Sequence, residues 1–194
     1  MNVHNVMSSM SAIVFLLMCI FCTVDTHLFV YPSLSKSLAF SICSLFLAIC
    51  FMMICVRKTT ASEITNMAKS VAKSIPGTDA QCSEGVRRAL KKLFGKLPAG
   101  MNCNANSMVK YWMNNPSLWQ EIAMSQAQGY ANQGYFVVAG WINPSGGYGH
   151  VVVIVPGTER YSENWGKKVP NTMDTGYNMR SSSQKLSNSF AREK

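Results

Sequence analysis

The sequence predicts an α+β fold in which helices come first and an antiparallel sheet follows, behind an apolar N-terminal segment. Three observations support this prediction. Residues 1–56 carry only two charged side chains, Asp25 and Lys36, whereas the remainder is strongly basic. Apolar residues then recur at the spacing of amphipathic helices as far as Gly134. Beyond Gly134 the pattern changes to short β-branched and aromatic runs separated by turns.

The N-terminal segment holds two long apolar runs. The second, LAFSICSLFLAICFMMICV (38–56), has 19 residues without a charge, close to the roughly 20 with which a helix crosses a bilayer. The first, residues 6–24, has a similar length with serines in its first half. We therefore expect a membrane segment over residues 1–58 with one or two transmembrane helices, followed by a domain over residues 59–194.

The orientation of this segment stays open. Arg57 and Lys58 directly follow the second run, and positive flanks favour the cytoplasm, which would place the domain inside. Interpreted as a signal peptide, the segment would place the domain outside, although the run is long for such a peptide and VRKTTASEI (56–64) is a poor cleavage site. With the function argued below, we expect a membrane-anchored domain that is periplasmic or extracellular.

Positive charge is concentrated in the second part of the chain. Residues 57–194 hold 17 Lys and Arg against 8 Asp and Glu, which accounts for the net charge of +9. Such a surface suits nucleic acid, acidic lipid or an anionic wall polymer, or is simply a solvated basic face. Nucleic acid ranks last because the basic residues cluster on one helix without interleaved aromatic residues. One histidine and two separated cysteines make no zinc set, so we expect no metal and no cofactor.

Four helices are expected before the sheet. Three of them follow from apolar spacing over residues 63–75, 104–115 and 115–134, the last with Asn115 as N-cap and Gly134 at C′. The sheet should contain a hairpin and two shorter strands. Its segments are YFVVAGWI (135–142), the turn NPSGGYG, HVVVIV (150–155), the loop PGTERYSENWG, KKVPNTMD (167–174) and the region around KLSNSF (185–190).

The remaining helix, QCSEGVRRALKKLF (81–94), contains the first residue with chemical potential. Thr78 with Gln81 fits a capping box, and Asp79 is an alternative N-cap, so Cys82 lies at about N3 or N4. Unpaired backbone N–H groups and the helix dipole at that position stabilise a thiolate. The alternative is a buried, inert cysteine, which is common for this residue type.

His150 is the only histidine after residue 27, so any imidazole base in the domain must be this residue. It is the first residue of a predicted strand that follows a glycine-rich turn. On position alone it is either a base at a sheet edge or a histidine bonded to its own loop. With Cys82 at a helix N-terminus, the pair has the parts of a thiol nucleophile and its base, which need a third polar group to orient the ring.

CSEGVRRAL (82–90), followed by ANQGYFVVAGWINPSGGYGHVVVIVPG (131–157), resembles the NlpC/P60 superfamily of papain-like cysteine peptidases and amidases. The nearest branches are CHAP-type amidases and the amidase effectors of bacterial type VI secretion. The resemblance covers residues 78–157 and extends loosely to residue 194. It implies a papain-like fold, with helices packed on an antiparallel sheet, and hydrolysis of amide bonds in peptidoglycan stem peptides or cross-links. An effector of this kind would also have an immunity or inhibitor protein as a partner.

Carried over residue by residue, the resemblance makes Cys82 the nucleophile and His150 the general base, which later protonates the leaving amine. The third group maps to Asp174 in the expected next strand, with Asn171 and Glu159 as rivals and a surface turn as the alternative for Asp174.

Three further residues are expected at the cleft. Gln81 could add a side-chain donor beside the attacked carbonyl, and Trp141 and Tyr148 could line the cleft, unless they are core or hairpin aromatics. Two other functions compete with wall hydrolysis: a membrane-tethered acyltransferase and a non-catalytic wall-binding module of the same fold. The intact pair of Cys82 and His150 argues against the second.

Overall fold

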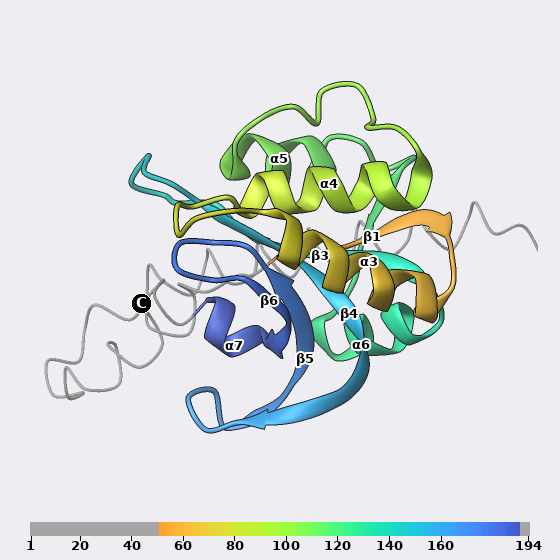
Figure 1. Ribbon diagram of the computed structural model, residues 1–194, viewed down its shortest axis with the longest axis vertical. Coiled ribbons are helices and arrows are strands. Elements are labelled where there is room, and N and C mark those ends of the chain that lie inside the picture. The colour runs from red at the N-terminus through yellow and green to blue at the C-terminus, as the bar shows by residue number, and fades with distance from the viewer. Residues whose placement is uncertain (1–50, 191–194) are drawn as a thin grey trace, which may run out of the picture. The chain divides into compact units, whose positions relative to one another are not determined.

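The structure is a computed structural model that describes residues 51–190 (Figure 1). It is an α+β arrangement, as predicted, built on a six-stranded sheet in the order β2-β1-β3-β4-β5-β6 with antiparallel pairing between all neighbours. The strands are β1 (Phe51–Lys58), β2 (Trp119–Glu121), β3 (Tyr135–Trp141), β4 (His150–Ser162), β5 (Lys167–Asp174) and β6 (Ser181–Lys185). The helices of the described residues are α3 (Ala61–Ser74), α4 (Cys82–Phe94), α5 (Ala105–Met113), α6 (Met124–Asn132) and α7 (Leu186–Ser189).

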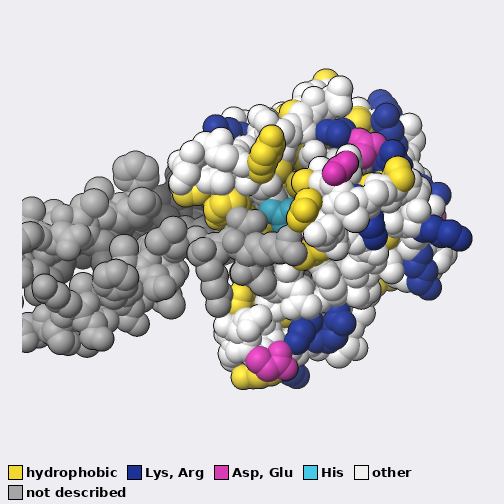
Figure 2. All heavy atoms as spheres, turned by 60° about the vertical axis from the view of Figure 1, so that its left-hand side comes forward, with side chains coloured by type: hydrophobic (Ala, Val, Ile, Leu, Met, Phe, Trp, Pro, Cys, Tyr) yellow, Lys and Arg dark blue, Asp and Glu magenta, His cyan; other side chains and the backbone are white. Residues whose placement is uncertain are grey.

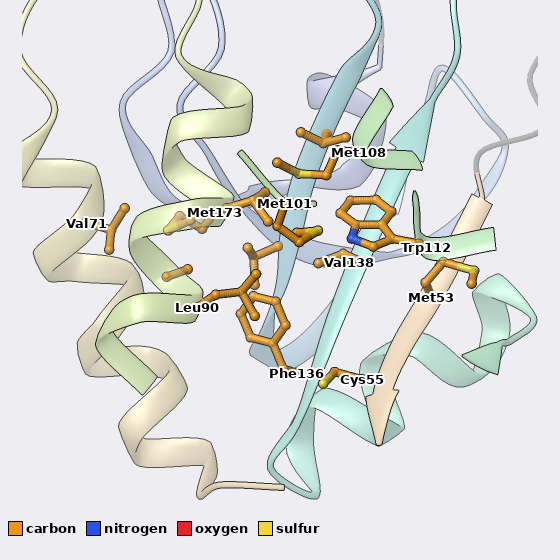
Figure 3. Close-up of a cluster of buried hydrophobic side chains, with 14 of the residues drawn as sticks. Met53, Cys55, Val71, Leu90, Met101, Met108, Trp112, Phe136, Val138 and Met173 are labelled. Atoms are coloured by element: carbon orange, nitrogen blue, oxygen red, sulfur yellow. The ribbon is translucent and has the colours of Figure 1, made fainter. Parts of the chain in front are cut away.

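The sheet is buried on both faces. α3, α4 and α5 cover one face over a cluster that includes Leu90, Trp112 and Phe136 (Figure 3). α6 and α7 cover the other face over a second cluster that includes Ile154 and Leu186. Because successive residues of a strand point to opposite faces, the apolar run of β4 supplies both clusters in alternation.

β1 corrects the expected membrane segment. The prediction of a helix over residues 38–56 is wrong for residues 51–56, which pair with β3 and β2. The domain therefore includes residues 51–58, ahead of the boundary expected at residue 59. An uninterrupted apolar run suits a buried strand as well as a helix, and Met52, Met53 and Cys55 are buried in the two clusters.

The remaining membrane predictions, residues 6–24 and 38–50, lie outside the described residues. Within residues 51–190, no helix is long and apolar enough to span a bilayer.

The start of α4 corrects the expected cap. Gln81 is the N-cap, its side chain makes no capping hydrogen bond, and Cys82 is therefore N1 rather than N3 or N4. The N-terminus is held by a tertiary contact instead. Gln81 N–H donates to the Thr175 carbonyl at 3.0 Å, and Thr175 Oγ1 donates to the Gln81 carbonyl at 2.9 Å. Two hydrogen bonds to the end of β5 thus replace the local capping box.

The segment between α5 and β3 also differs from the prediction. Asn115 is not the N-cap of a long helix, because residues 119–121 form β2 and α6 begins only at Met124. β2 pairs with β1, whose residues were expected to lie in the membrane segment. The sequence therefore offered no partner strand for residues 119–121. Gly134 follows the C-cap of α6 with φ 85°, as expected for C′.

The predicted hairpin of β3 and β4 is confirmed, and so is the strand at residues 167–174. β4 continues through the expected loop as far as Ser162. At the C-terminal end, residues 181–185 form β6, and the expected strand around KLSNSF is the helix α7 from Leu186 onward.

Candidate functional site

His150 and Asp174 meet at one end of two neighbouring interior strands of the sheet. His150 is the first residue of β4, and Asp174 is the last residue of the antiparallel neighbour β5. His150 Nε2 lies 3.1 Å from Asp174 Oδ2. Asp174 is completely buried, and its Oδ1 accepts the Gly176 N–H at 2.7 Å. The long gap of 24 residues between the two is therefore the length of one hairpin.

Cys82 approaches the same ring from α4. The thiol interacts electrostatically with the His150 ring, and both residues line one hollow of the surface. Since Nε2 faces Asp174, the remaining ring nitrogen, Nδ1, is the one available to exchange a proton with the thiol. The structure thus brings together the thiol, the imidazole and the carboxylate that the sequence singled out.

The electrostatics favour a charged imidazole. Burial lowers the pKa of His150, but hydrogen bonds with Asp174 and then Cys82, with the charges of both groups, outweigh it and raise the pKa to about 10. For Asp174, burial raises the pKa, but the hydrogen bond and charge of His150, with the Gly176 and Ser189 donors, lower it overall. At neutral pH the site therefore holds an imidazolium beside a carboxylate.

The thiol opens into a cleft with two hollows. One, of about 360 Å³, extends past His150, Tyr177 and Met179. The other, of about 420 Å³, extends along the start of α5 and the loop at residues 147–149. Both hollows are lined by Cys82, and Figure 2 shows a histidine side chain at the bottom of a depression bordered by hydrophobic side chains. The two hollows therefore meet at the thiol.

Of the three residues expected to bind substrate, only Tyr148 lines the cleft. It lines both hollows and is 93% exposed. Trp141 lines neither hollow, and its side chain packs against the second buried cluster, as the alternative of a core aromatic predicts. Gln81 is adjacent to Cys82, but its described contacts are main-chain bonds to Thr175 and Gly85, and its side chain does not line either hollow.

The two rivals of Asp174 lie elsewhere. Asn171 donates its main-chain and side-chain N–H groups to Gln128 Oε1 and bonds the Thr158 carbonyl. Glu159 lies in the extension of β4, beside a separate surface hollow lined by residues of α6. Asp174 is therefore the carboxylate that meets His150.

Close packing holds α4 against the end of β5. A Cβ atom added at Gly85 would lie 2.1 Å from Thr175 Oγ1, so only glycine allows this approach. Arg180 joins the adjoining loops: it donates to the carbonyls of Ile75 and Asp79 on one side and of Thr175 and Gly176 on the other. These contacts set the position of Cys82 relative to His150.

Sequence reasoning missed two polar residues behind Asp174. Gln184 on β6 and Ser189 on α7 contact each other and the carboxylate. Their surroundings, SSSQK and LSNS, lack the apolar alternation by which strands are found, so no local signal marked them.

Residues 51–190 contain no group of three or more His, Cys, Asp and Glu side chains arranged to hold a metal ion. Comparison with known proteins identifies no family, because no family description, no curated protein and no solved structure matches the chain.

Proposed function

We propose that the protein is a cysteine amidase or endopeptidase in which Cys82 is the nucleophile, His150 the acid and base, and Asp174 the residue that orients the ring. One observation carries the proposal: a buried carboxylate bonds the imidazole, and the imidazole shares one open hollow with a thiol at the first position of a helix. A nucleophile, a base and a group orienting the base are the parts that acyl transfer requires.

The arrangement supports a two-step hydrolysis. The Cys82 thiolate attacks the amide carbonyl carbon, and the N–H groups of the first turn of α4 stabilise the oxyanion. His150 donates its Nδ1 proton to the amine, which leaves with the electrons of the C–N bond, and a thioester remains. Water then attacks the thioester while His150 accepts its proton, and the free acid departs as the thiolate re-forms.

We further propose peptidoglycan stem peptides or cross-links as the substrate and an NlpC/P60-like papain fold as the family. The resemblance of residues 82–90 and 131–157 to that superfamily supports this choice. The two hollows beside Cys82 accommodate a peptide that continues on both sides of the cut bond. The net charge of +9 suits an anionic wall, which a membrane-anchored protein facing the wall would reach. An effector role would add an immunity or inhibitor protein as a partner.

The direct test uses the purified full chain in detergent with isolated wall sacculi. We expect soluble muropeptide fragments and one new amine for each bond cut. Cys82→Ala should abolish release, whereas Cys103→Ala is the matched control, since Cys103 lines neither hollow and should retain release. Full activity in Cys82→Ala would contradict the cysteine mechanism. A complete lack of release from every wall type would contradict the proposed substrate.

The second hollow favours acyl transfer as an alternative. An amine bound there would lie beside the Cys82 thioester and could take the acyl group in place of water. Adding a primary amine during turnover separates the two reactions: a transferase forms a new amide in proportion to the amine, whereas a hydrolase forms mainly the free acid.

A further inference from the structure

The Asp174 carboxylate has two side-chain neighbours besides His150, namely Gln184 and Ser189. Gln184 Nε2 donates to Asp174 Oδ2 at 3.0 Å, the oxygen that also faces His150 Nε2 at 3.1 Å. The other oxygen accepts the Gly176 N–H. Because Asp174 is completely buried, these donors rather than bulk water determine the plane of its carboxylate.

Gln184 is itself held in place by the elements behind the site. Its Nε2 lies 3.0 Å from Ser189 Oγ and 3.2 Å from Met179 Sδ. Ser189 is buried, and its hydroxyl lies 2.9 Å from Thr172 Oγ1 on β5. Two amide hydrogens therefore serve three acceptors, of which the charged carboxylate is the strongest. The network joins β5, β6 and α7 directly behind the His150 ring.

We propose that Gln184 is a positioning residue for Asp174, and this inference rests on the proposed function. Its amide directs the carboxylate at His150 Nε2, so that Nδ1 faces Cys82. A cationic side chain at position 184 would neutralise the charge of Asp174, and an acidic side chain there would compete with Asp174 for a proton. An amide donates without titrating, and it therefore holds the same geometry over the whole working pH range.

Gln184→Glu tests this role because the introduced carboxyl can donate a hydrogen bond only while it is protonated. Beside the buried Asp174, its pKa is raised. Near pH 5 the variant should react like the wild type, because the O–H group replaces the amide N–H. As the pH rises toward 8, the new carboxylate repels Asp174, and Cys82 reactivity should fall by roughly tenfold, the size of one lost charge-assisted hydrogen bond. Gln184→Leu should be slower at every pH.

Cys82 reactivity is measured as its rate of alkylation by iodoacetamide in the full chain. Trypsin then releases Cys82 in the peptide 74–87, which mass spectrometry quantifies. Gln133→Glu is the matched control, the same change at an exposed position. Thermal unfolding confirms that each variant is folded. The reaction needs no substrate, so it tests this inference even if the chain hydrolyses no wall peptide.

Two results would overturn the proposal. One is a wild-type alkylation rate in Gln184→Leu, which would mean that the amide does not act on the site. The other is a loss in Gln184→Glu that is equal at pH 5 and pH 8, which would reveal packing damage rather than a missing donor.

Discussion

His150 keeps its proton because the buried Asp174 carboxylate and the Cys82 thiol both lie against its ring. Asp174 bonds Nε2, and the Cys82 thiol approaches the ring from α4. Together these interactions outweigh the cost of burying the positive charge of the imidazolium. In the proposed mechanism, this proton is the one that the oriented ring later transfers to the leaving amine. We therefore expect the reactivity of Cys82 to depend on both His150 and Asp174, rather than on either residue alone.

Asp174→Asn should lower the pKa of His150 from about 10, since it removes the charge that faces Nε2. We expect hydrolysis to fall by about 100- to 10,000-fold, as for a triad whose orienting acid loses its charge. NMR titration of the His150 ring with labelled histidine measures the pKa. An unchanged midpoint would contradict the assigned contact.

The same shift makes stability depend on pH. The pKa of His150 in the folded chain, about 10, exceeds its ordinary value of 6.5, so its contribution is fully present below pH 6.5 and is lost as the pH rises toward 10. Urea unfolding should show wild-type stability declining across that window. Asp174→Asn should give a flatter profile there. A parallel decline in both proteins would show that another group is responsible.

The two partly buried cysteines should react differently. Burial raises the pKa of Cys103, with the positive charge of Arg87 opposing this only in part, so little thiolate forms there at pH 7. Cys82 lies beside the protonated His150. Limiting iodoacetamide should therefore label peptide 74–87 well before peptide 97–110, and His150→Ala should remove this preference. Faster labelling of Cys103 in the wild type would contradict this expectation.

The contact between α4 and the end of β5 fixes the position of Cys82 relative to His150. Gly85 allows Thr175 to reach the Gln81 carbonyl, and the two bonds between Gln81 and Thr175 fix the first turn of α4. Cys82 is the next residue, so a shift of this helix end moves the thiol away from His150.

Gly85→Ala should destabilise the protein by about 1–3 kcal/mol, because the new methyl group overlaps Thr175 Oγ1. In a Thr175→Ala background the same substitution should cost clearly less, since the overlapping hydroxyl and methyl groups are gone. Urea denaturation of the two single variants and the double variant measures the difference. Equal costs in both backgrounds would rule out this contact as the constraint.

β1 decides where the folded unit begins. It lies between β2 and β3 in the sheet, with Met52, Met53 and Cys55 buried. Without it, β3 becomes an open edge and β2 loses its partner. Residues 51–190 belong to one compact unit.

A chain that begins at residue 51 should therefore unfold cooperatively, whereas one that begins at residue 59 should not fold. Circular dichroism with thermal unfolding of both chains tests this. A cooperative transition in the shorter chain would show that β1 is dispensable.

The residues at the ends of elements were the most predictable part of the site. Cys82 and His150 were found because one starts a helix and the other follows a glycine-rich turn into a strand. Asp174 was chosen over the rivals Asn171 and Glu159 from the resemblance, and the register of β5 with β4 distinguishes it from Asn171. Gln184 was not found, because β6 has no apolar pattern of its own.

The sequence by itself determined the features that depend on residues a few positions apart. These are the helices α3, α4 and α5, the β3–β4 hairpin, and the positions of Cys82 near the start of a helix and of His150 at the start of a strand. The tertiary structure decided that residues 51–58 form a strand, that Thr175 rather than a capping box holds α4, and that Gln184 backs Asp174. The physical reason is distance along the chain: Thr175 and Gln81 are 94 positions apart, and a hydrogen bond across such a gap leaves no local pattern.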